Sequence, residues 1–203
     1  MPERPSPDLE RMVTDVEWAM SKQFAARDLV PMLENLLRAA PSASDASYFA
    51  KLRLSELIVG DAPFRAARLA RDVLASGDSD RAWAVLGLAH SLLGHYRLAA
   101  RSYRRALALA PDCGVYEHNL GHVLDVALNR PRDALVHLER AHRSMPEERE
   151  VSSSYAHALL RSGQPEKARE LLLCAVKGPA EADEILKVWR GANGNLAPGE
   201  PDL

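Results

Sequence analysis

The sequence predicts an all-α protein built from repeated pairs of short helices, an α-solenoid. Marker residues recur at a nearly fixed period: Gly87 returns 34 residues later as Gly121, and Pro111 returns 35 residues later as Pro146. Between the markers, apolar residues recur at spacings of three and four, which is typical of amphipathic helices. One pair of short helices cannot bury its apolar face alone, so neighbouring pairs must complete the core by stacking.

The expected elements follow in order along the chain. Residues 8–45 form an N-terminal helical pair, and its first helix, over 8–26, carries an apolar stripe of Met12, Val16, Met20 and Phe24. Four helix-turn-helix units come next, at 46–79, 80–113, 114–148 and 149–180. Residues 181–190 form a capping helix that closes the last apolar face. The flanking segments 1–7 and 191–203 are polar and turn-rich, and we expect them to be disordered.

One unit contains an extra residue. Ala99 and Ala134 are 35 residues apart, whereas Ala134 and Ala168 return to a spacing of 34. We place the inserted residue near Asn129-Arg130-Pro131. Pro131 itself is expected at the first position of a new helix, where its missing N–H costs nothing.

The window from Asp80 to Cys113 carries Trp83, Leu86, Gly87, Tyr96 and Pro111 at set distances. At these residues the chain resembles the tetratricopeptide repeat (TPR) family. The resemblance implies a right-handed superhelix of about four to five repeats that binds proteins and is not an enzyme. His90 stands where the family usually has tyrosine. Glu117 stands where Trp83 predicts an aromatic residue.

The resemblance also implies a concave groove built from the first helix of each pair. Helical spacing assigns the face opposite Trp83 to this groove. In its first half the groove is apolar, and in its second half it is polar and rich in histidine. The predicted partner-binding residues are Leu54, Leu57, Arg81, Ala84, Leu88, His118, Asn119, His122, Asp125, Ser153 and His157.

Two features of this wall suggest other chemistry. His118 and His122 lie one helical turn apart and could chelate a metal with His157 or Asp125, which makes a metal-binding protein one alternative. Asn119 stands where a zinc hydrolase has its general-base glutamate. Ser152, Ser153 and Ser154 precede His157 without a nucleophile elbow. We therefore expect no catalytic residue, no metal and no cofactor, and interpret the histidines as hydrogen-bonding groups of a peptide groove.

Composition agrees with a soluble binding protein. The formal net charge is −2, so general attraction to nucleic acid is not expected. No segment is apolar enough to span a membrane, so we expect no membrane partner and a cytoplasmic location. Arginines make up 21 of the 26 basic residues, which suggests a GC-rich bacterial genome. Cys113 and Cys174 give no disulfide framework. An arginine-rich stripe is interpreted as a solvated convex face, with binding of an acidic protein surface or of nucleic acid as the alternatives. It includes Arg65, Arg68, Arg71, Arg97, Arg101, Arg104 and Arg105.

The predicted function is a non-enzymatic scaffold or chaperone-like module that holds a peptide or helix of a partner protein. The small chain with an N-terminal helical region also resembles secretion chaperones of the TPR type. That resemblance implies, as an alternative, a homodimer formed through residues 8–26.

Overall fold

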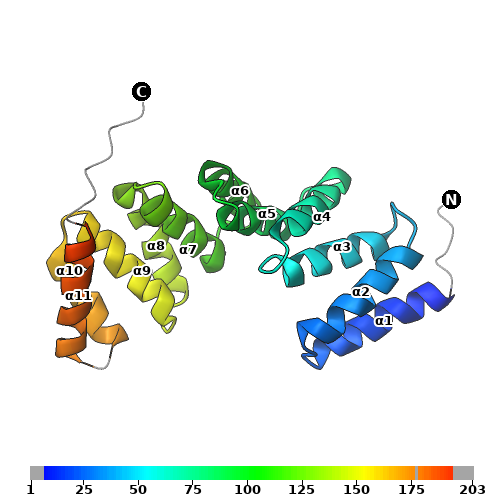
Figure 1. The fold of residues 1–203 in the computed structure, drawn as a ribbon, viewed down its shortest axis with the longest axis horizontal. Coiled ribbons are helices and arrows are strands. Elements are labelled where there is room, and N and C mark those ends of the chain that lie inside the picture. The colour runs from blue at the N-terminus through cyan, green and yellow to red at the C-terminus, as the bar shows by residue number, and fades with distance from the viewer. Residues whose placement is uncertain (1–6, 177, 194–203) are drawn as a thin grey trace. The chain divides into compact units, whose positions relative to one another are not determined.

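The computed structural model describes residues 7–176 and 178–193. Every regular element in that range is a helix, which confirms the predicted all-α class (Figure 1). The chain divides into two compact units, Met1–His95 and Tyr96–Leu203. The boundary falls inside the repeat predicted at 80–113. The segments 1–6 and 194–203, which contain most of the two predicted disordered ends, lie outside the described residues.

Unit 1 is a run of antiparallel helices in which each packs against the next. They are α1 (Pro7–Ser21), α2 (Ala26–Ala39), α3 (Asp45–Ile58), α4 (Pro63–Ser76) and α5 (Asp80–Leu92). Local chemistry sets their ends. Ser44 and Ser79 cap α3 and α5, because each side-chain oxygen accepts a hydrogen bond from a backbone N–H of the first turn. Pro63 begins α4, as expected for proline at a first helical position.

The stripe of α1 is covered by its own chain. Val16 is 1% exposed and belongs to the unit 1 core together with Leu33 and Leu36 of α2, while Met12 and Met20 pack against that core. The centre of this face therefore packs within its own chain. The end of the stripe differs, because Phe24 is 41% exposed and stacks edge-on with Trp18.

Unit 2 continues the same pattern of packed helices. It contains α6 (Tyr96–Leu109), α7 (Gly114–His122), the π-helical segment η1 (Val123–Ala127), α8 (Pro131–Ser144), α9 (Arg149–Arg161), α10 (Pro165–Ala175) and α11 (Pro179–Asn193). The capping helix α11 is longer than predicted, so residues 191–193 are helical and not disordered. Close packing explains Gly121: a Cβ there would lie 2.6 Å from Cγ of Leu138.

The inserted residue lies inside a helix and not at the turn where we placed it. Gly94, Asn129 and Gly163 have positive φ angles of 75°, 53° and 81° and mark the equivalent turn of three successive pairs. The spacing from Gly94 to Asn129 is already 35 residues, so the extra residue precedes Asn129. The segment that absorbs it is η1, since each π-helical turn holds more residues than an α-helical turn.

Backbone hydrogen bonds confirm this position. The N–H that closes the turn donates to a carbonyl five residues earlier in two pairs, from His95 to His90 and from Gln164 to Leu159. In the pair that contains η1 the same bond spans six residues, from Arg130 to Leu124. A helix therefore tolerates the insertion by widening one turn, and the core residues on either side of it keep their faces.

Candidate protein-binding face

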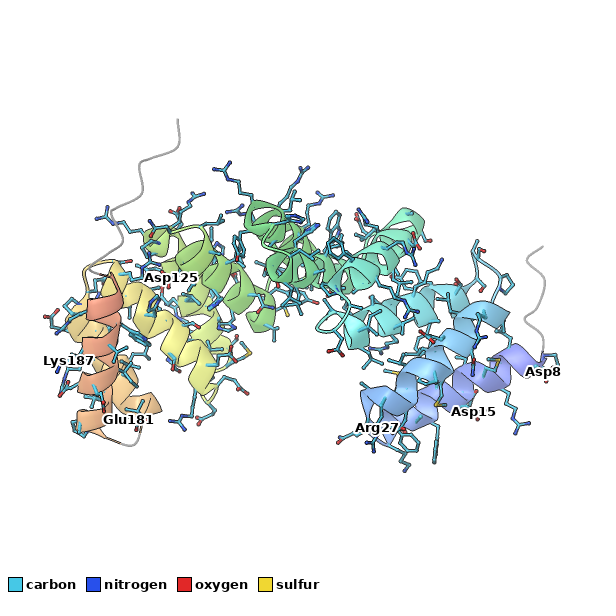
Figure 2. The ribbon with its side chains drawn as sticks, viewed as in Figure 1. Asp8, Asp15, Arg27, Asp125, Glu181 and Lys187 are labelled. Atoms are coloured by element: carbon cyan, nitrogen blue, oxygen red, sulfur yellow. The ribbon has the colours of Figure 1, made fainter. Side chains whose placement is uncertain are left out.

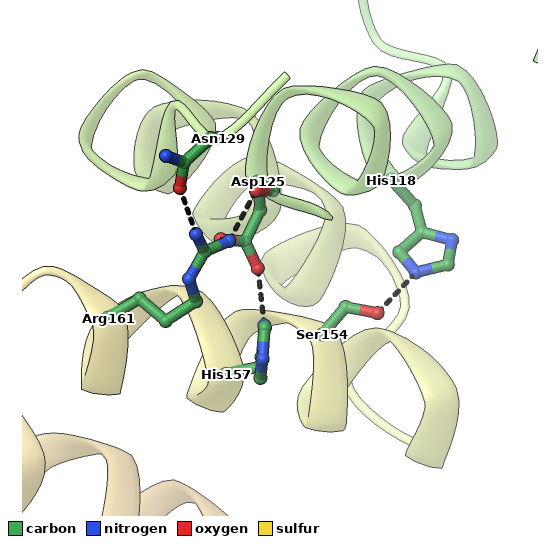
Figure 3. A network of polar contacts seen from close by, with 6 residues as sticks. All are labelled: His118, Asp125, Asn129, Ser154, His157 and Arg161. Atoms are coloured by element: carbon green, nitrogen blue, oxygen red, sulfur yellow. Dashed lines mark hydrogen bonds and ion pairs between the residues drawn. The ribbon is translucent and has the colours of Figure 1, made fainter. Parts of the chain in front are cut away.

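The most constrained polar group of unit 2 is Asp125, in the middle of η1 (Figure 2). Asp125 is 1% exposed, yet its carboxylate has two charged or ionisable partners from α9. Nδ1 of His157 lies 2.5 Å from Oδ2, and Nη1 of Arg161 lies 2.8 Å from Oδ1 (Figure 3). A buried carboxylate is tolerated only when partners compensate for its lost hydration. Here the partners are His157 and Arg161, so the contact joins α9 to η1, which continues α7.

Arg161 also satisfies the altered backbone. Its guanidinium donates to the carbonyl oxygen of Asp125 and to Oδ1 of Asn129, in addition to the carboxylate (Figure 3). The Arg130 N–H donates to Leu124, one residue before Asp125, so the Asp125 carbonyl is directed to the arginine instead. The insertion and the ion pair are thus parts of one arrangement, which we call the Asp125 network: Asp125, Asn129, His157 and Arg161.

His118 forms a second link between the same helices. Its Nε2 lies 3.0 Å from Oγ of Ser154 on α9 (Figure 3). Burial lowers the pKa of His118 below its usual 6.5, the carboxylate of Glu150 raises it in part, and nearby His122 lowers it further. The neutral imidazole is therefore the form favoured by the fold.

The structure divides the predicted unit 2 residues into two groups. Asp125, His157 and His118 hold the first helices together. Asn119, His122 and Ser153 make no side-chain hydrogen bond within the described residues. His122 is exposed, and Asn119 and Ser153 are half-buried. We call the surface of α7 and α9 that carries Asn119, His122 and Ser153 the unit 2 face. Trp189 of α11 also contacts His157, with ring centroids 5.1 Å apart. The sequence did not predict this contact.

The predicted unit 1 residues lie differently. Leu54 is fully buried in the core, so its assignment to the groove was wrong: α3 turns this residue toward its neighbours and away from solvent. Leu57 and Ala84 are half-buried. Leu88 is 37% exposed, and Leu92, one helical turn later on α5 and absent from the prediction, is 52% exposed. We call the surface of α5 that carries Ala84, Leu88 and Leu92 the unit 1 face.

Arg81 is held by an ion pair in unit 1. Its Nη2 lies 2.6 Å from Oε2 of Glu56 on α3, and Arg53 lies 3.3 Å from the same oxygen. Burial raises the pKa of Glu56 to about 7, although Arg53 opposes the shift and Asp80 adds to it. This pair borders the unit 1 face and joins α3 to α5.

The structure does not gather the histidines into a metal site. His157 faces Asp125, whereas His118 faces Ser154. Among the described residues, no group of three or more histidine, cysteine, aspartate or glutamate side chains could hold a metal ion. The serine alternative fails for a related reason: Ser154 bonds to His118, while the carboxylate of Asp125 bonds to His157, so serine, histidine and aspartate do not form one chain of hydrogen bonds.

Glu117 is a further polar residue whose role the sequence did not reveal. It replaces the expected aromatic residue, is 4% exposed, and bonds to Nδ1 of His137 at 2.6 Å and Nη1 of Arg140 at 3.2 Å. It lines an open pocket of about 560 Å³ together with Pro111, Asp112, Gly114, Arg140, Arg143 and Ser144. An ionic contact therefore replaces apolar packing between α7 and α8.

Comparisons with known proteins agree with this repeat architecture. Two family models described as "Tetratricopeptide repeat" match residues 80–113 and 125–175. The chain contains tetratricopeptide repeats. Repeats of this family form protein-interaction scaffolds, and the two matches support this general function. No curated protein matches the sequence closely enough to add a more specific role.

Solved structures show the same fold. A crystal structure of MamA protein superposes with a TM-score of 0.66 at 18% identity, covering 95% of this chain and 98% of that one. MamA from Desulfovibrio magneticus RS-1 gives a TM-score of 0.67 at 14% identity, covering 92% and 97%. At these identities the likeness extends to the fold alone. Within the described residues, no helix is both long and apolar enough to cross a membrane.

Proposed function

We propose that this tetratricopeptide repeat protein binds a peptide or helical segment of a partner protein on the unit 2 face. The observation that carries the proposal is the contrast between fixed and open polar groups on α7 and α9. Asn119, His122 and Ser153 have no side-chain hydrogen bond in the described part of the chain. The helices beneath them are joined by the buried Asp125 network. Preorganised donors and acceptors bind a ligand with less loss of conformational freedom.

The open side chains suit a peptide ligand. An asparagine amide can both donate to and accept from a peptide backbone, and a serine hydroxyl and an imidazole can do the same. Exposed Val115 and Val126 lie on α7 and η1 at either end of this stretch and could contact apolar side chains. A segment with polar backbone contacts in the middle and apolar residues at its ends would match this pattern.

The alternative of a secretion chaperone that dimerises through 8–26 gains less support, because the central residue of that helix, Val16, is buried within the chain. The peptide proposal is tested by selecting peptides from a displayed library on the immobilised full chain. Binding of a selected peptide is then measured by isothermal titration calorimetry for wild type, for Asn119→Ala with His122→Ala, and for Arg132→Ala with Val136→Ala as a control on α8.

The first double variant should weaken binding by at least about tenfold, because truncating two central contacts costs more than about 1.4 kcal/mol. The α8 control, whose two residues are exposed on another helix, should change it by less than about twofold. Equal losses in the two double variants would place the peptide elsewhere and refute the proposal.

A further inference from the structure

Helix α6 is rich in arginine and has no acidic residue of its own. It contains four arginines and no acidic residue, and the whole stretch from Arg81 to Pro111 lacks aspartate and glutamate. All four arginines, which are Arg97, Arg101, Arg104 and Arg105, are exposed. The buried residues of α6 are Ala99, Ala100, Ser102, Tyr103 and Ala106, which leave one continuous arc of the helix to the arginines.

Several arginines elsewhere in unit 2 have acidic partners. Arg130, at the start of α8, lies 2.6 Å from Asp133, and Arg169 of α10 lies 2.6 Å from Asp183. In α6 the side chains of Arg101 and Arg104 form no ion pair with any described residue. Ordinary solvated helix faces in this protein therefore mix charges of both signs, and α6 departs from that pattern.

Two leucines border the arginine arc. Leu98 is 48% exposed and Leu109 is 47% exposed. With 3.6 residues per turn, these leucines project beside Arg101 and Arg105 along one edge of the arc. The surface therefore presents guanidinium groups beside exposed leucines. An acidic partner that fits it must carry apolar side chains beside its negative groups.

We propose that the exposed face of α6 binds an acidic helical segment of another protein, one that carries leucine-like side chains beside its carboxylates. Arginine suits this role because its planar guanidinium binds a carboxylate through two parallel hydrogen bonds. Leucines beside the arginines would pack against apolar residues of such a segment, whereas single-stranded nucleic acid is bound mainly by aromatic stacking and phosphate contacts. This surface is separate from the unit 2 face, so either proposal can fail alone.

The test uses the full chain and a fluorescent helical peptide of glutamate, alanine and leucine, with binding followed by anisotropy. The double variant Arg101→Glu with Arg104→Glu should weaken binding by at least about tenfold, because two attractions become repulsions. The control, Arg11→Glu with Arg27→Glu, makes the same change of net charge on exposed side chains of unit 1 and should alter binding by less than about twofold.

Two further measurements separate the possible partners. Leu98→Gln keeps the charge of α6, so it should weaken the acidic peptide severalfold and leave a leucine-free glutamate peptide unchanged. A single-stranded oligonucleotide should bind more weakly than the acidic leucine peptide at equal salt. Tighter binding of the oligonucleotide, or equal losses in the two double variants, would overturn the proposal.

Discussion

In unit 1 the exposed residues of α5 are the leucines Leu88 and Leu92, whereas in unit 2 helix α7 carries exposed His122 and half-buried Asn119. The supporting contacts differ as well. Glu56 in unit 1 pairs with arginines near the surface, while Asp125 in unit 2 is buried between two helices. Units made from the same kind of helical pair can therefore carry different recognition chemistry, and in unit 2 an inserted residue accompanies that difference.

The largest expected effect is the removal of the buried carboxylate. Asp125→Ala leaves Arg161, whose side chain is 7% exposed, without its anionic partner, and breaking a buried pair in this way costs about 3–5 kcal/mol. Glu56→Ala in unit 1 should cost less than about 1 kcal/mol, because solvent screens a pair that is partly exposed. Urea unfolding of both variants measures the difference. Equal costs would mean that burial does not distinguish the two ion pairs.

The next effect concerns the inserted residue. Deleting exposed Val126 should let η1 return to an ordinary α-helix and lose the contacts of Asn129, at a cost of about 1.5–3 kcal/mol for a charged hydrogen bond. Helix α5 holds no extra residue, so deleting Ala84 should cost more free energy of unfolding. The deletion rotates one side of α5 relative to the other, so that either Ala82 or Val85 and Leu86 leave the core face. Circular dichroism with urea unfolding would reveal the opposite order if η1 were not the site of the insertion.

The sequence predicted the repeat and its turns because these depend on local chemistry. Gly121, a marker of the period, lies at a close helix contact, where steric rules favour glycine in any helical hairpin. Burial of Leu54 was not predictable from helical spacing, since it depends on how neighbouring helices cover α3.

The partners of the polar residues were also out of reach of the sequence. Glu117 was visible as a departure from the family pattern, but its partner His137 lies 20 residues later on another helix. The insertion was counted correctly and placed too late, because residue spacing does not show whether a turn or a widened helix absorbs it. Asp125 was predicted to line the groove, because residue spacing does not show contacts between separate helices. The network that buries Asp125 joins α9 to the π-helical segment.

A smaller effect is the dependence of stability on pH, which should differ in sign between the units. His118 has a lowered pKa, so the unfolded chain binds more protons than the folded one. Its contribution to stability is complete above about pH 6.5 and is lost as the pH falls through the folded pKa. Glu56 has a pKa raised from 4.5 to about 7, so its contribution is complete below about pH 4.5 and is lost as the pH rises toward 7.

Urea unfolding across this pH range measures both contributions. His118→Gln should reduce the loss of stability on acidification, and Glu56→Gln should reduce the loss on raising the pH from about 4.5 to 7. Unchanged pH profiles in both variants would contradict the assignment of these two groups.

The smallest expected effect on stability comes from the unit 1 face. Leu88→Ser should change the free energy of unfolding by no more than about 0.5 kcal/mol, because this side chain is already partly exposed. Peptides selected on the full chain should still bind this variant, since the proposed site lies in unit 2. A titration that shows lost binding with intact folding would transfer the site to α5.

The most direct measurement is hydrogen–deuterium exchange of the full chain with and without a selected peptide. If the unit 2 face is the binding surface, exchange should slow in α7, η1 and α9 and stay unchanged in α3 and α5. Slower exchange in α5, with α7 and α9 unaffected, would contradict the proposal that the polar face of unit 2 binds the partner.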